Sequence, residues 1–403
     1  MTRFDFDSIT PRKGSNCVKW DAEAPVRPGK DVIPMWVADM DFQAAPFIRE
    51  ALQKRLDHGV FGYTVVPQSW YDCVASWFGR RHGWKIDPSW IQYTTGVVPG
   101  ISAVIKALTS PGDKVIIQTP VYNCFFSSIR NNGCIAAESS LRICDGPRYE
   151  MDFESLEREC ADPAAKIFLL CNPHNPAGRV WTREELEKAG EICRRHGVIV
   201  VSDEIHCEIV RPGLSYVPMG SVDQSNTISL VSPSKSFNIA GLQMAAIVSD
   251  NPDWRKRIDK AININEICDV NPVGPVGVEA AYSKEGAQWL DELNAYIWDN
   301  YELMKTKLQP LADAFPVFEL EGTYLAWIDC RGLGMPSTEI ENSLLENEGV
   351  WINAGTMYGC DGFIRVNLAA PRSLVSEGLD RLVCGLKRLK ASTTDRIAHE
   401  SGR

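Results

Sequence analysis

The chain has 403 residues, of which 23% are charged and 44% hydrophobic, and its net charge is −10. This length exceeds what one hydrophobic core usually supports, and the composition is that of a globular protein rather than a disordered or fibrous one. The acidic balance, without a long Lys/Arg block, argues against nucleic acid and anionic membranes as partners. No stretch approaches the ~20 apolar residues of a membrane helix and the N-terminus lacks a signal peptide's apolar core, so we expect a cytoplasmic protein.

Thirteen cysteines are scattered singly from Cys17 to Cys384, without a CxxC pair or an accompanying histidine pattern. This distribution argues against a metal site and against a disulfide framework. It favours reduced, mostly buried thiols that pack as small hydrophobic side chains.

Short β-branched runs in the middle of the chain predict buried strands of a mostly parallel sheet. The runs are KVIIQTP from Lys114, KIFLLCNP from Lys166, VIVVSDEIH from Val198, TISLVSPSK from Thr227 and QMAAIVSD from Gln243. Between the second and third run, Thr182 with Glu185 three residues later forms a capping-box signature, and the helix it opens closes on Gly197. The alternation predicts an α/β fold built from strand-helix-strand units.

From about Trp254 the pattern becomes helical, and the segment from Glu285 to Leu308 has apolar residues at helical spacing. We expect this helix to lead out of the first domain into a smaller α+β domain. Its strands are predicted in FELEGTYLAWIDC, GVWINAG and GFIRVNLAAP, and its helices near Ser337 to Glu348 and Ser373 to Lys390. The predicted division is an N-terminal segment that packs on the small domain, a large domain, a small domain and a flexible tail: 1–50, 51–285, 286–390 and 391–403.

Four segments carry residues suited to chemistry, and the first of them is SPSKSFNIAG. It places Lys235 in a loop after a strand, among small and hydroxyl-bearing neighbours. A lysine amine can form a Schiff base, and hydroxyl groups can bind a phosphate without adding charge. Taken alone, a lysine in this position is more often a solvated surface residue.

The second segment is VIVVSDEIH, in which an apolar strand ends in Asp203, Glu204 and His206. Open α/β sheets bind ligands at the carboxyl ends of their strands. A buried Asp beside a pyridine nitrogen would keep that nitrogen protonated, which turns the ring into an electron sink. The alternative is that Asp203 caps the next segment and His206 packs in the core.

The other two segments are CNPHNPAGRVW and YTTGVVPGISAVIKAL. The first has two turn signals at a strand end, and its Asn175-Pro176 bond is a candidate for the cis form, although a plain loop is the simpler interpretation. The second puts Gly96 and the amides after it at a helix start, where backbone N–H groups can bind an anion. Glycine at a turn is common, so neither segment is specific alone.

Together these segments resemble, in order and spacing, the fold-type I enzymes that use pyridoxal phosphate (PLP). More narrowly, the chain is similar to the MalY/PatB family of cystathionine β-lyases, which includes cystalysin-like cysteine desulfhydrases. The similar blocks, spread from about Phe4 to Lys390, are MWVADMDF, GVFGYT, TPVYNCFF, NPHNPAGRVWTREEL, SDEIH, SPSKSFNIAGL and FIRVNLAAPR. The resemblance implies a large PLP-binding domain with a mostly parallel sheet and a smaller α+β domain.

The resemblance also implies the residues that hold the cofactor and act on the substrate. Lys235 would hold PLP as a Schiff base and then remove the Cα proton, Asp203 would pair with the ring nitrogen, and Tyr122 would stack on the ring. These three form the expected catalytic set. The remaining cofactor contacts are expected from Asn175, Val97, Val98, Ser232, Ser234, His206 and Tyr63. Tyr63 would come from a neighbouring subunit, which implies a homodimer.

Arg365 lies inside an otherwise apolar strand, where an unpaired guanidinium is costly, so it needs an anion. The resemblance supplies the substrate α-carboxylate, held by a two-pronged pair. The alternative is a structural salt bridge to Asp or Glu. The resemblance puts Trp36 and Tyr324 in the same pocket, where plain packing would explain them nearly as well.

Two positions bear on the reaction. Many fold-type I aminotransferases carry a tyrosine three residues after the Asp and an arginine eight after the Lys, and this chain has His206 and Gln243 there. Both match the lyase branch, which implies carbon–sulfur β-elimination from cystathionine, cysteine or related S-substituted cysteines. The alternatives are an aminotransferase and a non-enzymatic regulator with the same fold. The choice of thioether or thiol stays open.

Overall fold

The computed structural model describes residues 3–22, 29–144, 146–264 and 269–401. Its largest sheet has seven strands in the order β2-β10-β9-β8-β7-β3-β4. The strands are β2 (Ile91–Thr94), β10 (Ala245–Val248), β9 (Thr227–Val231), β8 (Ile199–Asp203), β7 (Ala165–Cys171), β3 (Lys114–Ile117) and β4 (Ile135–Glu138). All five predicted strands are present, and β10 alone in this sheet runs antiparallel to its neighbours. The prediction of a mostly parallel sheet is confirmed.

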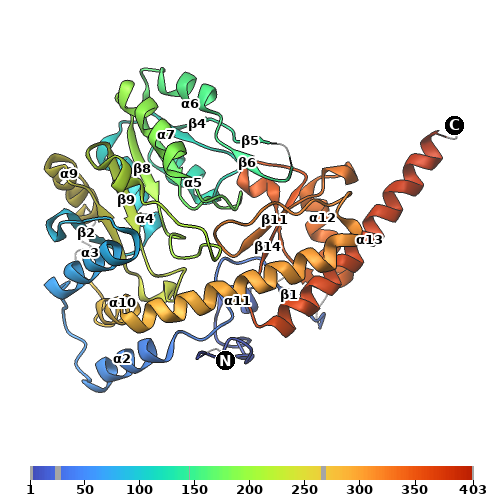
Figure 1. Ribbon diagram of the computed structural model, residues 1–403, viewed down its shortest axis with the longest axis horizontal. Helices are drawn as coiled ribbons and strands as arrows, with labels where there is room; N and C mark the ends of the chain where they lie inside the picture. Colours follow the sequence, from blue (N-terminus) through green and yellow to red (C-terminus); the bar gives the residue numbers. More distant parts are fainter. Residues whose placement is uncertain (1–2, 23–28, 145, 265–268, 402–403) are drawn as a thin grey trace.

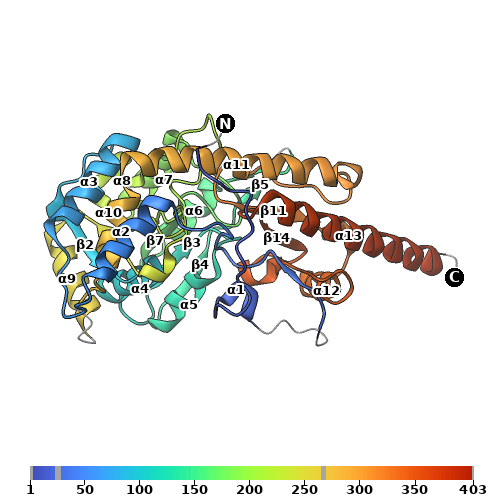
Figure 2. The same cartoon turned by 90° about the horizontal axis from the view of Figure 1, so that it is seen from below.

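Helices cover both faces of this sheet (Figures 1 and 2). In β7, Ile167 and Leu169 pack on one face while Phe168 and Leu170 pack on the other, as the two-residue period of a strand requires. The first face packs against α4, α5 and α9, and the second against α6 and α7. The helices of this part are α2 (Pro46–Asp57), α3 (Gln68–His82), α4 (Val97–Leu108), α5 (Asn123–Asn131), α6 (Phe153–Cys160), α7 (Arg183–Arg195), α8 (Met219–Val222), α9 (Pro252–Asn263) and α10 (Gly274–Ala281).

A smaller antiparallel sheet, in the order β11-β14-β13, lies apart from the large one (Figure 1). It consists of β11 (Leu325–Asp329), β14 (Phe363–Asn367) and β13 (Asn353–Ala354), and it places Arg365 opposite Trp327 and Asn353. The strand predicted in FELEGTYLAWIDC begins only at Leu325, because Thr323 has a left-handed backbone, with φ 68°, that interrupts the extended chain.

Two long helices run along the small sheet. The remaining elements are β1 (Ile33–Pro34), β12 (Val350–Trp351), β5 (Arg142–Ile143), β6 (Tyr149–Glu150), α1 (Val18–Asp21), α11 (Lys284–Leu308), α12 (Ser337–Ser343) and α13 (Arg372–Ser401). In Figure 1, α11 extends from α10 past β14, and α13 projects beyond the small sheet to the C-terminus. The helix expected to end near Lys390 therefore continues to Ser401, and the sequence has no proline after Pro371 to stop it.

The predicted boundaries at residues 50, 285 and 390 stay predictions. The N-terminal segment does reach the small domain, because β1 pairs in parallel with β12. Part of that segment, residues 1–2 and 23–28, lies outside the described residues. No helix in the described ranges combines the length and apolar character needed to cross a membrane.

The capping box predicted at Thr182 is confirmed. The Thr182 hydroxyl accepts the Glu185 N–H at 3.2 Å, and Glu185 Oε2 accepts the Thr182 N–H at 2.8 Å. Such a cap stabilises a helix start because it satisfies N–H groups that have no partner within the helix.

We expect Thr182→Ala to lower the free energy of unfolding by about 1 kcal/mol, because it removes the side-chain acceptor of the cap. Urea denaturation followed by circular dichroism measures this change. The control is Glu191→Ala, which lies on the exposed face of α7 and should change stability by less than about 0.5 kcal/mol. Equal effects of the two substitutions would contradict the assignment.

Candidate active site

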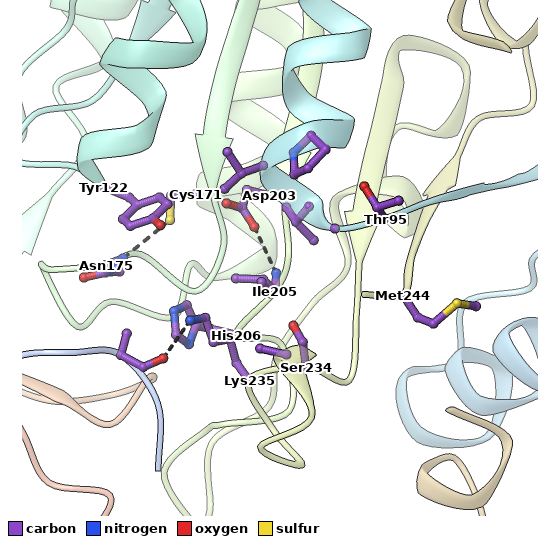
Figure 3. A pocket seen from close by; sticks show the side chains of 16 residues that line it. Thr95, Tyr122, Cys171, Asn175, Asp203, Ile205, His206, Ser234, Lys235 and Met244 are labelled. Atoms are coloured by element: carbon purple, nitrogen blue, oxygen red, sulfur yellow. Dashed lines mark hydrogen bonds between the residues drawn. The ribbon is translucent and has the colours of Figure 1, made fainter. Parts of the chain in front are cut away.

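A cavity of about 190 Å³ lies at the carboxyl ends of the strands of the large sheet. β8 ends at Asp203, β7 ends at Cys171 opposite it, and β9 is followed directly by the loop that carries Lys235. Figure 3 shows Tyr122, Asp203, His206 and Lys235 around this cavity, with Asp203 and His206 at and just after the end of β8 and the other two from separate segments. The lining residues are Ala38, Thr95, Gly96, Val97, Val98, Pro99, Tyr122, Cys171, Asn175, Asp203, Ile205, His206, Ser234, Lys235, Ala240 and Met244. This is where open α/β sheets bind ligands.

Asp203 is a buried carboxyl group that forms no ion pair with any described residue. Burial raises the pKa of Asp203 to about 7, although the Ile205 N–H, which donates to Oδ1 at 3.1 Å, and the charge of Lys235 act in the opposite direction. The capping role considered for Asp203 is therefore real, but it uses only one of the two carboxylate oxygens. The other is available to a ligand that brings a positive charge.

Lys235 Nζ donates a hydrogen bond to the Ala38 carbonyl at 2.6 Å. Burial lowers the pKa of Lys235, and the charge of Arg365 lowers it further, while Asp39 and Asp203 raise it. A buried amine with a depressed pKa is neutral in a larger fraction of molecules than a surface lysine. It can therefore serve as a nucleophile or as a base.

Arg365 is 3% exposed, and its guanidinium contacts only neutral groups. One terminal nitrogen donates to Asn175 Oδ1 at 3.1 Å, the other donates to the Trp36 carbonyl at 2.8 Å, and Nε has no hydrogen-bond partner. No carboxylate of the described residues lies within ion-pair distance, so the structural salt bridge considered for Arg365 is not formed. The guanidinium can still donate hydrogen bonds to a carboxylate from Nε and from a remaining terminal N–H.

Two aromatic side chains border the cavity beside Lys235. Tyr122 precedes α5, and burial raises the pKa of its hydroxyl well above the usual value. Burial lowers the pKa of His206 to about 3, with smaller effects from Lys235 and Arg365, so this imidazole is neutral at physiological pH. The His206 ring meets Tyr324 edge-on, with ring centroids 5.9 Å apart, and Nδ1 has no partner.

The start of α4 forms one end of the cavity. Val97 and Val98 are the first helical residues after Gly96, where backbone N–H groups have no partner within the helix. Ser234 borders the cavity, but Ser232 does not, because its hydroxyl donates to the Met244 carbonyl at 2.7 Å. The free backbone N–H groups at this end of the cavity can donate hydrogen bonds to a phosphate group.

Besides Ser232 and Arg365, three predicted residues do not border the cavity. Tyr63 is 97% exposed in the connection between α2 and α3. The Trp36 ring stacks on Trp351 with centroids 4.3 Å apart, so Trp36 contributes its carbonyl to Arg365 rather than its ring to the pocket. Tyr324 is buried, and its hydroxyl donates to the Ala38 carbonyl at 3.0 Å.

The residues that meet here fit PLP on structural grounds. The cavity holds an amine for the aldehyde, a buried carboxyl group without a cation for the ring nitrogen, and a helix start for the phosphate. Asn175 Oδ1 accepts from Arg365, which leaves the amide nitrogen to donate to a ring oxygen. Asn175-Pro176 is cis, as predicted.

Sequence reasoning missed Ala38, Cys171 and Met244. Ala38 acts through its backbone carbonyl, and a carbonyl has no signature in the sequence. Cys171 could have been found from its place at the strand end before NPHNPAG, where its Sγ accepts the Asn175 N–H at 3.5 Å. Met244 fixes Ser232 through its carbonyl, again a backbone contact.

Comparison with known proteins gives full-length matches. Residues 30–382 match the family described as aminotransferase class I and II. The chain is 40% identical to cystathionine beta-lyase PatB of Bacillus subtilis, covering 95% of this chain and 100% of PatB. It is 35% identical to protein MalY of Escherichia coli, covering 96% and 100%.

The crystal structure of cystalysin from Treponema denticola, which contains a pyridoxal 5'-phosphate cofactor, superposes on this chain with a TM-score of 0.91. The two chains are 36% identical, and the match covers 96% of this chain and 99% of cystalysin. The resemblance inferred from the sequence blocks is confirmed. The chain belongs to the aminotransferase class I and II family, in the branch that contains PatB, MalY and cystalysin.

Proposed function

We propose that this protein is a PLP-dependent carbon–sulfur β-lyase. It converts L-cystathionine, L-cysteine or a related S-substituted cysteine to pyruvate, ammonia and a thiol or sulfide. The observation that carries the proposal is the set of Lys235 and Asp203 on one cavity, with Arg365 behind its lining residue Asn175, to which it donates at 3.1 Å, and without an ion-pair partner among the described residues. The names of PatB, a cystathionine β-lyase, and of the PLP-containing cystalysin support the same activity over nearly the whole chain.

Different residues of the cavity would bind the different parts of the cofactor. Lys235 would bind the aldehyde carbon, Asp203 the ring nitrogen, and the Asn175 amide the ring oxygen, while Tyr122 stacks on the ring and His206 lies nearby. The phosphate would meet the amides of Val97 and Val98 and the hydroxyl of Ser234. Ser232 is less suited to bind the phosphate, because its hydroxyl already donates to the Met244 carbonyl.

Bound PLP supplies a ring that takes up the negative charge left when Cα loses its proton. The Asp203 carboxylate would hold the proton on the ring nitrogen, because the buried pair would stabilise both charges. Arg365 orients the substrate through its α-carboxylate, and the Lys235 amine removes the Cα proton. A thiolate then leaves from Cβ readily, because thiols, with a pKa of about 8.5, are comparatively acidic.

An aminotransferase uses the same proton removal but needs a 2-oxo acid to complete its cycle. His206 is neutral and Gln243 lies outside the cavity, and no arginine borders the cavity among the described residues. The phosphate is therefore held by neutral donors from the described residues. These features accord with the lyase branch.

Mixing the holoenzyme with L-cystathionine and no oxo acid distinguishes β-elimination from transamination. We expect pyruvate to form over many turnovers, measured by coupling to lactate dehydrogenase and NADH. Lys235→Ala should reduce the rate by about 10³-fold or more, because both the nucleophile and the base are lost. One equivalent of product per active site, without further turnover, would indicate the aminotransferase instead.

The raised pKa of Asp203 predicts how the cofactor-free protein responds to pH. Its folded pKa of about 7 exceeds the ordinary value of 3.8, so the unfolded chain releases this proton at lower pH than the folded protein. Asp203 therefore leaves stability unchanged below about pH 4 and reduces it progressively up to about pH 7, by at most ~4 kcal/mol.

We expect Asp203→Asn to be more stable than the wild type at pH 8, by up to a few kcal/mol, and to show no such gain at pH 4. Asparagine keeps the oxygen that accepts the Ile205 N–H. Urea denaturation of both cofactor-free proteins at the two pH values measures the difference. A gain of the same size at both would show that Asp203 is not the titrating group.

We infer that the protein is a homodimer in which Tyr63 reaches the phosphate of the partner subunit. The end of α2 and the chain between α2 and α3 expose several apolar side chains close together: Leu56, Val60, Phe61, Tyr63 and Val65. An exposed apolar run of this kind is typical of an interface. A second copy that covers it would bring Tyr63 into a pocket whose phosphate end holds few donors.

Phe61→Asp should convert a particle of about twice 44.9 kDa into one of 44.9 kDa, because a charge would be buried in the interface. Light scattering after gel filtration measures the mass. Ile143→Asp, at an exposed apolar position on β5, is the matched control and should leave the mass unchanged.

Tyr63→Phe should weaken PLP binding about tenfold, as expected for one lost hydrogen bond to a charged group. A monomeric wild type, together with unchanged PLP binding in the Tyr63→Phe variant, would refute the inference.

A further inference from the structure

Residues 35–40, called here the bridging segment, are held through their backbone carbonyls by both parts of the molecule. The Trp36 carbonyl accepts from Arg365 and Asn353 of the small sheet, and the Val37 and Asp39 carbonyls accept from Asn367 Nδ2. The Met40 carbonyl accepts from Asn238, which lies three residues after Lys235. The segment thus joins the Lys235 loop to the Arg365 strand.

At its centre, the Ala38 carbonyl accepts two hydrogen bonds. Lys235 Nζ donates at 2.6 Å and the Tyr324 hydroxyl at 3.0 Å. A carbonyl oxygen only accepts, so it holds the amine through an N–H and leaves the nitrogen lone pair free. The position of this one oxygen therefore holds one N–H of Lys235 and keeps the lone pair directed away from Ala38.

Outside the cavity, a group of charged residues holds the same segment, with Lys19 and Asp41 buried and Arg12 and Asp39 partly buried; we call it the Asp41 cluster. The Asp41 carboxylate accepts from Lys19 Nζ at 2.6 Å, from Trp20 Nε1 at 2.7 Å and from Arg12 at 2.7 Å. Arg12 also binds Asp39 at 2.6 Å and the Met40 carbonyl at 3.0 Å. The Lys19 side chain is only 1% exposed.

The cluster is balanced in charge, with two cations and two carboxylates. A buried ion of this kind is tolerated only with its partners in place, which makes the arrangement rigid. Arg12 and Lys19 belong to the N-terminal segment, and Trp36 Nε1 donates to the Lys19 carbonyl at 3.2 Å. The part of the chain from Arg12 to Trp20 is thereby fixed against the bridging segment.

We propose that Arg12, Lys19 and Asp41 are positioning residues for Lys235: they fix the bridging segment so that the Ala38 carbonyl holds the amine with its lone pair directed at the substrate. The proposal rests on the role of Lys235 in the proposed function. None of the three residues borders the cavity. Their effect passes through the Ala38 carbonyl and through the charge of Asp39.

The charges that face Lys235 determine whether its pKa rises or falls when the Asp41 cluster is altered. Arg365 from β14 lowers its pKa, while Asp39, Asp203 from β8 and Cys124 from α5 raise it. In the intact cluster, Arg12 and Lys19 neutralise Asp39 and Asp41. Removal of the Lys19 charge leaves the carboxylates with one cation, so the ammonium form of Lys235 becomes more stable and its pKa rises.

The test uses Lys19→Met and measures the reactivity of Lys235 without turnover. Cofactor-free protein is treated briefly with acetic anhydride at a series of pH values, and modification of the Lys235 peptide is quantified by mass spectrometry. Only a neutral amine reacts. We expect the midpoint to rise by about one pH unit in Lys19→Met. In the holoenzyme, the pH titration of the yellow absorbance should move in the same direction.

Lys114→Met is the matched control. It makes the same substitution in a 2.6 Å Lys–Asp pair, with Asp162, at the opposite end of the large sheet from the cavity. Its midpoint should equal that of the wild type. Circular dichroism and thermal melting establish that each variant is folded.

If Lys19→Met does not fold, Trp20→Phe takes its place, because it keeps every charge and removes one donor from Asp41; a smaller rise is expected. An unchanged midpoint in the folded variant overturns the proposal. Failure of the wild type to form pyruvate would instead refute the proposed function, since the labelling requires neither substrate nor PLP.

Discussion

Arg365 lies in the central strand of the small sheet, almost fully buried, with Asn175 Oδ1 and the Trp36 carbonyl as its hydrogen-bond acceptors. A full charge held by neutral groups alone is costly, and an incoming carboxylate supplies the missing anion. Asn175 follows β7 of the large sheet, while Trp36 lies in the N-terminal segment. In the proposed function, substrate recognition by Arg365 would therefore depend on three separate parts of the chain being held together.

The same burial acts on the other ionisable groups of the cavity. It raises the pKa of Asp203 to about 7, lowers that of His206 to about 3 and lowers that of Lys235. Each shift favours the neutral form, as desolvation requires. In the protein without its cofactor, the charged forms of these groups are therefore unfavourable until a ligand of complementary charge binds. Their burial lowers the stability of the cofactor-free protein.

Much of the fold was predictable because it depends on local patterns. The apolar runs around Ile167 and Val200 specify buried strands, and Asp203 at the end of such a run marks the ligand edge of the sheet. The capping box at Thr182 specifies where α7 begins. The direction of β10 was not predictable, since strands buried on both faces have the same composition in either orientation.

Contacts made by the backbone or decided by neighbours in space also escaped prediction. Ser232 and Ser234 look alike in the sequence, but the hydroxyl of Ser232 donates to a carbonyl twelve residues away. Trp36 was expected in the pocket, and its ring stacks on Trp351 instead. The acceptor of Lys235 is the carbonyl of an alanine, which no side-chain pattern reveals.

The way Lys235 is held bears on which reaction follows proton removal. Its amine is tied to the Ala38 carbonyl on the side of the N-terminal segment, and the Tyr324 hydroxyl is tied to the same oxygen. Transamination would require a base that carries the proton from Cα to a second carbon, whereas loss of the thiolate from Cβ would need no such second protonation. An amine restrained at one point serves the second reaction better than the first. On the proposed role of Arg12, Lys19 and Asp41, the anchoring of the bridging segment would therefore suit β-elimination better than transamination.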